Sequence, residues 1–192
     1  MPRGPRERLG VCVARCAVSA SLIASSTMAL ADGTFTLRSA AFHEGQSVPP
    51  AQRFNRDGCT GGNVSPPLSW QHAPPNTASF AIMMHDPDAP GRGWWHWAVA
   101  NIPATVHSLP ANASASGALT RLGALQARND FSDEGYGGPC PPPGKRHRYV
   151  ITIYALNAPL TRLVANRPAP FFEHEILGAA IAKASLTLTD QR

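Results

Sequence analysis

The sequence predicts a mainly β protein: an antiparallel β-sandwich with a few short helices and its main helix near the C-terminus. Proline (19) and glycine (16) are frequent in the 192 residues, which fits short strands joined by turns better than a helical bundle. Strand patterns come first, and the one clear helical pattern follows them. Because no helical patterns separate the strands, a doubly wound parallel sheet is excluded, whereas a partly open barrel stays an alternative.

The N-terminus has the order of a secretory signal peptide. Residues 1–8 are basic, residues 11–30 are apolar or small, and Ala29-Leu30-Ala31 forms an A-x-A cleavage site. Arg15 interrupts the apolar stretch, and what remains is too short and too polar to cross ~30 Å of hydrocarbon. A lipoprotein modified at Cys16, a membrane anchor or a start assigned too early are the alternatives.

We therefore predict a signal peptide over residues 1–31 and a single domain over residues 32–192. The mature protein is expected to be periplasmic or secreted, with no stable membrane insertion after cleavage. Much of the positive charge lies in the removed segment, which holds four arginines and one glutamate. Since no basic run is left in the mature chain, we expect no nucleic-acid partner.

The weaker elements lie in the first part of the mature chain. Residues 34–37 alternate and predict an edge strand, whereas Pro49 and Pro50 limit regular pairing in residues 48–54. The following segments are predicted as a Gly/Asn/Pro-rich loop, a short strand and a turn, over residues 57–67, 68–70 and 73–76.

The three strands with the strongest sequence patterns are predicted over residues 79–85, 94–102 and 148–156. In the first, alternation places Phe80, Ile82 and Met84 on one face. The last is apolar on both faces, so we expect it inside the sheet.

In the second strong strand, alternation places His96 on the face of Trp94 and Ala98, with Trp95 and Trp97 on the opposite face. The remaining segments are a surface excursion, a Gly/Pro loop, an amphipathic helix and a last strand, over residues 104–124, 136–145, 171–184 and 185–189.

Two cysteines, Cys59 and Cys140, are left once Cys12 and Cys16 leave with the signal peptide. Two cysteines in an oxidising compartment predict one disulfide, with two buried free thiols as the alternative. Neither has the C-x-x-C spacing of a metal site, and we predict no metal ligands.

Three titratable residues lie at strand ends or beside a rigid loop: Asp86, His96 and His147. A stiff scaffold that presents polar groups on loops is a common arrangement for binding sites. Each also has a structural interpretation: Asp86 as a turn residue before proline, and His96 as a buried core residue. Arg148 is expected to face away from His147 and to serve as a structural ion-pair partner.

The motifs together resemble the phosphatidylethanolamine-binding protein (PEBP) family, in its bacterial Raf-kinase-inhibitor-like branch, often labelled YbhB/YbcL. The matching motifs cover residues 57–157 in family order. They are GGNVSPPLSW at 61–70, FAIMMHDPDAP at 80–90, WWHW at 94–97 with NIP at 101–103, NDF at 129–131, YGGPCPP at 136–142 and HRY at 147–149.

This resemblance implies a β-sandwich with a small pocket for phosphate, acetate or phospholipid head groups. Carried over by motif, the ligand-binding residues are Asp86, His96, His147, Tyr149, Pro141, Pro142 and Tyr136. The run of three prolines leaves the register of the wall residue open by one position. Kinase regulation, known for eukaryotic relatives, is not expected of an exported protein.

We therefore expect a protein that binds a small anionic ligand without turnover and without a cofactor. An ordinary histidine pKa of ~6.5 predicts that binding strengthens as the pH falls toward that value. The alternatives are an exported inhibitor or interaction module that acts on a protein partner, and a metal-assisted hydrolase. Against the last, the sequence lacks closely spaced metal ligands and a G-x-S-x-G motif.

Overall fold

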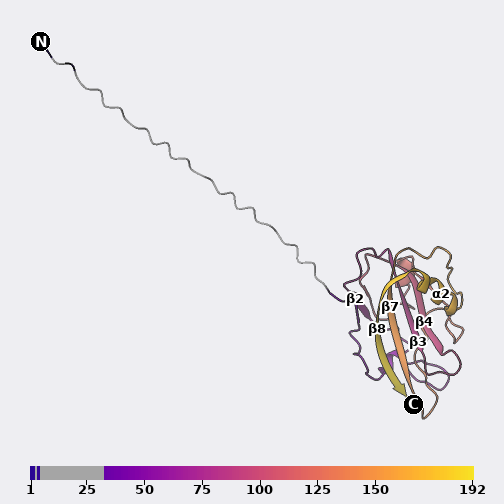
Figure 1. Cartoon of the computed structure of the whole chain (residues 1–192). Coiled ribbons are helices and arrows are strands. Elements are labelled where there is room, and N and C mark those ends of the chain that lie inside the picture. The colour runs from indigo at the N-terminus through magenta and orange to yellow at the C-terminus, as the bar shows by residue number, and fades with distance from the viewer. Residues whose placement is uncertain (3, 5–32) are drawn as a thin grey trace. The chain divides into compact units, whose positions relative to one another are not determined.

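The computed structural model describes residues 1, 2, 4 and 33–192 (Figure 1). The predicted signal peptide therefore lies almost wholly outside the described residues. Asp32–Arg192 form one compact unit.

Two antiparallel sheets make up the fold, as predicted. The smaller has the strand order β1-β2-β5, and the larger has the order β6-β4-β3-β7-β8. The strands of the smaller sheet are β1 (Thr36–Arg38), β2 (Leu68–Gln71) and β5 (Ser108–Leu109). Those of the larger are β3 (Ser79–Asp86), β4 (Trp94–Pro103), β6 (Leu125–Gln126), β7 (Arg146–Leu156) and β8 (Ala180–Gln191). Short helices complete it: η1 (Pro50–Gln52), α1 (Ala118–Arg121) and α2 (Ala169–Ala179).

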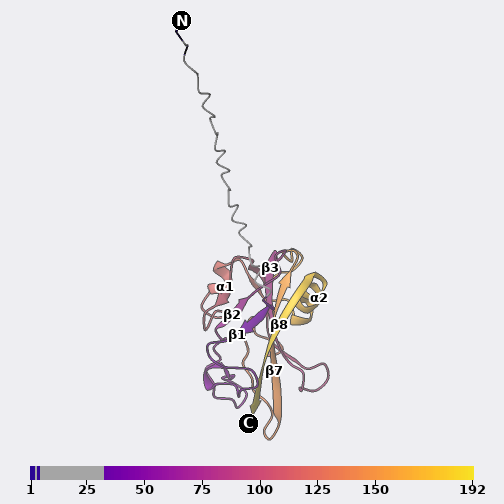
Figure 2. The same cartoon turned by 60° about the vertical axis from the view of Figure 1, so that its left-hand side comes forward.

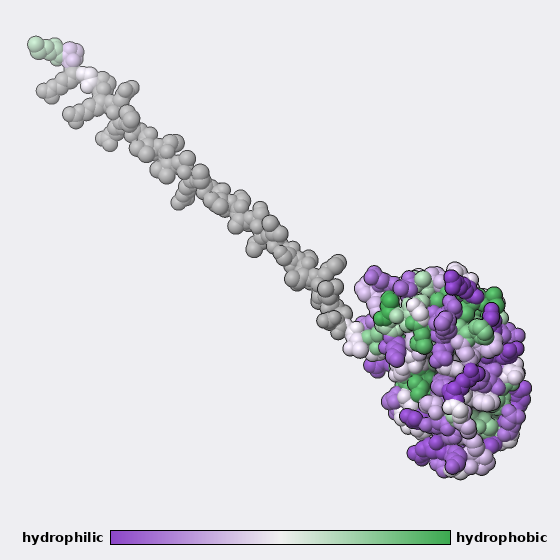
Figure 3. All heavy atoms as spheres, turned by 45° about the vertical axis from the view of Figure 1, so that its right-hand side comes forward, coloured by the Kyte–Doolittle hydropathy of each residue, from purple (hydrophilic) through white to green (hydrophobic). Residues whose placement is uncertain are grey.

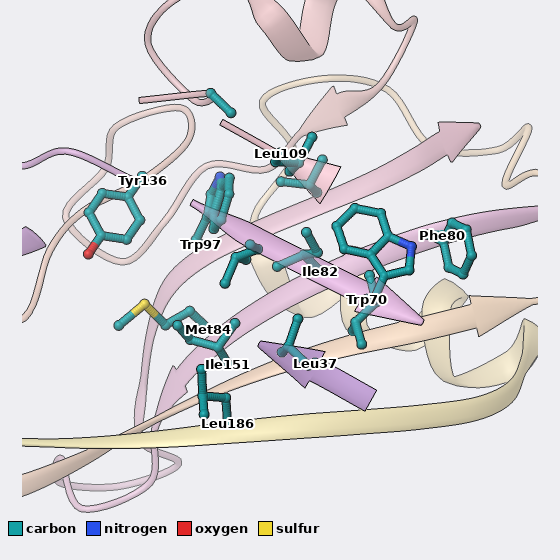
Figure 4. Close-up of a cluster of buried hydrophobic side chains, with 14 of the residues drawn as sticks. Leu37, Trp70, Phe80, Ile82, Met84, Trp97, Leu109, Tyr136, Ile151 and Leu186 are labelled. Atoms are coloured by element: carbon teal, nitrogen blue, oxygen red, sulfur yellow. The ribbon is translucent and has the colours of Figure 1, made fainter. Parts of the chain in front are cut away.

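Apolar residues pack in two layers, one on each face of the larger sheet. The inner layer lies between the sheets and includes Trp70 from β2 with Phe80 and Ile82 from β3 (Figure 4). The outer layer includes Met83 from β3 and Phe172 from α2. Figure 2 accordingly shows β1 and β2 on one side of β7 and β8, with α2 on the other. The predicted alternation of β3 is therefore confirmed.

Strand β7 pairs with β3 on one side and with β8 on the other, so its predicted interior position is confirmed. The 104–124 excursion contains strand β5 and the single turn of α1, two elements that the sequence did not predict. In the view of Figure 3, apolar side chains lie scattered among polar ones on the surface.

The boundary between the helix and the last strand was predicted wrongly. The predicted helix over residues 171–184 ends at Ala179, and β8 begins at Ala180 instead of residue 185. The segment 180–184 has apolar residues at helical spacing, but it pairs with β7, with Ala180 opposite Leu156 and Ala182 opposite Ala155. Alanine is compatible with both structures, so the tertiary pairing decides.

The pairing of β3 with β4 contains a β-bulge at His96. Met84 lies opposite Trp97 and His85 lies opposite Trp95, so His96 is the extra residue. Trp97 consequently belongs to the inner layer and Trp95 to the outer one. The prediction that both tryptophans share one face is wrong, because a bulge interrupts strict alternation.

We expect Phe172→Ala to lower the free energy of unfolding by about 3–5 kcal/mol, because this fully buried ring fills the layer under α2. The adjacent Phe171→Ala is a matched control: its ring is 50% exposed and contacts Arg167, so we expect a loss below about 1 kcal/mol. Urea unfolding of both variants measures the difference. Equal losses would contradict the packing described for α2.

Candidate ligand-binding pocket

A pocket of about 260 Å³ lies where β3 ends and β7 begins, closed by three loops. Its walls combine a few polar side chains with many apolar ones. The lining residues are Asp86, Ala89, Pro90, Trp94, His96, Phe131, Cys140, Pro141, Pro142, His147 and Tyr149. Six of the seven predicted ligand-binding residues therefore line one cavity.

Asp86 is the buried carboxylate of this pocket. Its Oδ1 accepts hydrogen bonds from the backbone N–H groups of Asp88 (2.9 Å) and Ala89 (3.1 Å), which form a turn. Its Oδ2 lies 2.6 Å from Nδ1 of His147. The structural interpretation of Asp86 is thus confirmed: one oxygen stabilises the turn, and the other contacts His147.

His147 is also buried, and its Nδ1–H donates to the Asp86 carboxylate. This bond determines the role of the second ring nitrogen. Nε2 accepts a hydrogen bond when the ring is neutral and donates one when the ring is protonated. In the protonated state the ring would keep its bond to Asp86 and present Nε2–H as a donor.

A second ion pair, Asp88–Arg148, lies beside the Asp86–His147 pair and is more exposed to solvent. Arg148 donates to Asp88 through Nε (2.9 Å), Nη2 (2.7 Å) and its backbone N–H (2.8 Å). These hydrogen bonds lower the pKa of Asp88 to about 2. Arg148 is therefore the structural partner that the sequence predicted, and it ties the turn after β3 to β7.

His96 is held as a neutral ring. Its Nδ1–H donates to the carbonyl oxygen of Gly137 at 2.7 Å. Burial lowers its pKa to about 4, because the charged form loses its hydration. Nε2 of neutral His96 is an acceptor, so this ring offers an anion no N–H donor on that side.

Two neutral donors of the pocket-lining residues have no hydrogen-bond partner among the described residues: the Tyr149 hydroxyl and the Trp94 indole N–H. Tyr149 is fully buried, and its ring packs edge-on against His96, with centroids 5.1 Å apart. Burial and the nearby Asp86 charge raise the pKa of Tyr149, so the hydroxyl keeps its proton. Buried unpaired donors in native proteins usually indicate a water molecule or a ligand.

Tyr136 is the one predicted pocket residue that does not line the cavity. Its hydroxyl donates to the carbonyl oxygen of Gln52 at 2.7 Å. Its ring packs edge-on against Trp97 in the inner layer (Figure 4). Tyr136 is thus a core residue, and it is the following Gly137 that contacts the site, through His96.

The proline loop forms one wall, and its register is now defined. Pro141 and Pro142 line the pocket together with Cys140, whereas Pro143 does not. Cys140 forms the predicted disulfide with Cys59.

Phe131 is the main lining residue that sequence reasoning did not select. Its ring stacks on Phe54 at 4.0 Å and packs edge-on against Trp94 and His96. The NDF motif at 129–131 was a usable signal, because it lies between the two histidine segments. Trp94 in the WWHW motif was also a usable signal, because strand alternation placed it on the same face as His96.

A profile described as phosphatidylethanolamine-binding protein matches residues 38–191. The chain belongs to the PEBP family. The predicted resemblance and fold are thereby confirmed, and the pocket lies on the PEBP segments that carried the resemblance.

Individual PEBP relatives match over most of this domain. UPF0098 protein YbcL of Escherichia coli K12 is 40% identical over 177 residues, covering 87% of this chain and 96% of YbcL. A crystal structure of YbcL, titled a new member of the mammalian PEBP family, superposes with a TM-score of 0.78, covering 82% of this chain and 98% of that one. LppC of Mycobacterium tuberculosis H37Rv, named as a lipoprotein, is 35% identical over 138 residues, covering 71% of this chain and 63% of LppC.

Two features are absent from the described residues. Over residues 33–192, no helix is long and apolar enough to cross a membrane. In the same range, no three His, Cys, Asp or Glu side chains are grouped as ligands for a metal ion.

The buried neutral His96 predicts acid-sensitive stability. Its pKa is about 4 in the folded protein and near 6.5 in the unfolded chain, so the unfolded state alone takes up a proton as the pH falls through this window. This favours unfolding by roughly 2 kcal/mol between about pH 6.5 and pH 5. Urea unfolding should show a smaller acid loss for His96→Asn, whose amide can still donate to Gly137. An equal loss in both proteins would show that His96 does not cause it.

Proposed function

We propose that this PEBP-family protein is an exported binding protein whose pocket takes a small anionic group, a phosphate or a carboxylate, without turnover. The observation that carries the proposal is the buried Asp86–His147 pair beside the two unpaired donors of Tyr149 and Trp94. This set can offer up to three hydrogen-bond donors to one anion.

A carboxylate inside an anion pocket needs compensation, and Asp86 has it. Two backbone N–H groups and the His147 ring already satisfy its oxygens. The negative charge of Asp86 is therefore offset within the wall, and Nε2 of His147 is the ring nitrogen left to contact the ligand.

The apolar remainder of the wall supports a ligand with an organic substituent. Trp94 and Phe131 meet edge-on at 5.3 Å, and Pro90, Pro141 and Pro142 extend the apolar surface. Such a wall is typical of small-molecule sites, in which a few polar groups orient the ligand.

Binding without turnover is the simplest use of this set of residues. The eleven lining residues include no serine, threonine or lysine, and the one cysteine among them is in a disulfide. The pair of Asp86 and His147 has the form of a base with its orienting carboxylate, but the wall supplies no serine, threonine or free cysteine for it to activate.

Export is part of the same proposal. It is supported by the signal-like order of the N-terminal residues, the Cys59–Cys140 disulfide and the lipoprotein name of the LppC relative. Fractionation of the cells that produce the protein, with detection of the cleaved N-terminus, tests this part.

We expect Asp86→Asn and His147→Asn each to weaken the binding of phenyl phosphate at least about tenfold, because each removes the charged donor pair. The control His174→Asn changes an exposed histidine on α2 and should bind as the wild type does. Isothermal titration measures the affinities, and circular dichroism verifies folding. Wild-type affinity in both pocket variants would refute the proposed site.

A further inference from the structure

The Pro141–Pro142 wall of the pocket has few attachments to the rest of the protein. Proline has no N–H, so residues 141–143 cannot donate backbone hydrogen bonds. Before this run, the N–H of Phe54 donates to the carbonyl of Pro139 at 3.0 Å. After it, the N–H of Gly144 donates to the carbonyl of Arg192 at 2.7 Å.

Within residues 33–192, the proline run makes no backbone hydrogen bond to another part of the protein. Its one backbone hydrogen bond stays inside the loop, where the N–H of Lys145 donates to the carbonyl of Pro142 at 3.1 Å. The Cys140 sulfur carries no proton in a disulfide and donates none. The covalent bond to Cys59 therefore attaches the proline wall to the rest of the protein, together with the packing of the buried Pro141 ring.

The other end of the disulfide lies in a well-anchored segment. The N–H of Gly61 donates to Phe54 at 2.7 Å, and that of Gly62 donates to Pro50 at 3.0 Å. A Cβ on Gly61 would clash with the carbonyl oxygen of Arg53, so the two backbones are in tight contact. Cys59 is thus on the fixed side, and Cys140 is on the side that can move.

The disulfide also separates two cavities. Cys140 lines the ligand pocket, whereas Cys59 lines a second cavity of about 260 Å³ that also contains Arg53, Asp190 and Arg192. Pro141 contributes to both. The disulfide and Pro141 therefore form a partition, and opening it would enlarge the pocket on the side of the proline wall.

Both cysteines are half-buried. The neighbours of Cys59, Gly58 and Thr60, are exposed, whereas Cys140 lies between the buried Pro139 and Pro141, so solvent reaches the bridge from the Cys59 side. A disulfide that solvent reaches is open to attack by an external thiolate. This exposure distinguishes Cys59–Cys140 from a bridge enclosed in a core.

We propose that Cys59–Cys140 is a redox modification site for a dithiol reductant, and that its reduction loosens the ligand pocket. A thiolate of the reductant attacks one sulfur, the protein disulfide breaks, and a mixed disulfide forms. The second thiol of the reductant then displaces the protein sulfur. Two electrons and two protons pass to Cys59 and Cys140, and the reductant leaves as its own disulfide. The affinity part of this inference rests on the proposed function.

The experiment compares oxidised and dithiothreitol-reduced full-length protein, with serine at Cys12 and Cys16 in every sample. Amide hydrogen exchange at Phe54 and Gly144 reports on the two anchors of the loop, and Ile153 in the core of β7 reports on the fold. Titration with phenyl phosphate reports on the pocket. The double variant Cys59→Ser/Cys140→Ser, with and without dithiothreitol, controls for direct effects of the reductant.

We expect reduction to speed exchange at Phe54 and Gly144 at least about tenfold while Ile153 stays protected, and to weaken phenyl phosphate binding by a similar factor. The double variant should match the reduced protein, and reoxidation should restore both signals. Unchanged exchange and affinity would overturn the inference, as would loss of protection at Ile153. If the oxidised protein does not bind phenyl phosphate, the proposed function fails, and the exchange data alone decide whether the disulfide holds the wall.

Discussion

The contact between Asp86 and His147 is the interaction on which the rest of the site depends. It joins the end of β3 to the start of β7 at 2.6 Å, in a position where water hardly reaches either group. A buried carboxylate is costly unless it is fully hydrogen-bonded, and here two backbone N–H groups and one imidazole provide that. The Asp88–Arg148 pair on the outer face holds the same two strands in the same register.

Around this contact, the two pocket histidines differ in chemistry. His147 has a carboxylate as its partner, whereas His96 has a backbone carbonyl and is buried with a pKa of about 4. The surroundings of His96 therefore favour its neutral form, whereas the ring of His147 lies beside a carboxylate. The bulge in β4 places His96 there, because it turns the ring toward Tyr149 and Phe131.

Much of this arrangement could be predicted from local patterns. Alternation assigned the faces of β3, residue spacing separated Arg148 from the pocket, and the cysteine count predicted the bridge. The failures share one cause, which is tertiary context. A one-residue bulge reversed the expected face of Trp97, and pairing with β7 converted the end of the predicted helix into strand. Tyr136 lies in a glycine-rich motif next to the pocket, but its ring turns into the core.

We propose that an anion binds through His147 and that His96 stays neutral. Long-range ¹H–¹⁵N NMR of the imidazole rings during a titration with phenyl phosphate tests this directly, because it reports the protonation and tautomer of each ring. The account predicts that His147 becomes doubly protonated as the ligand binds, while His96 keeps its single proton on Nδ1. A ligand that saturates the protein and leaves His147 unchanged, or that protonates His96 instead, would contradict it.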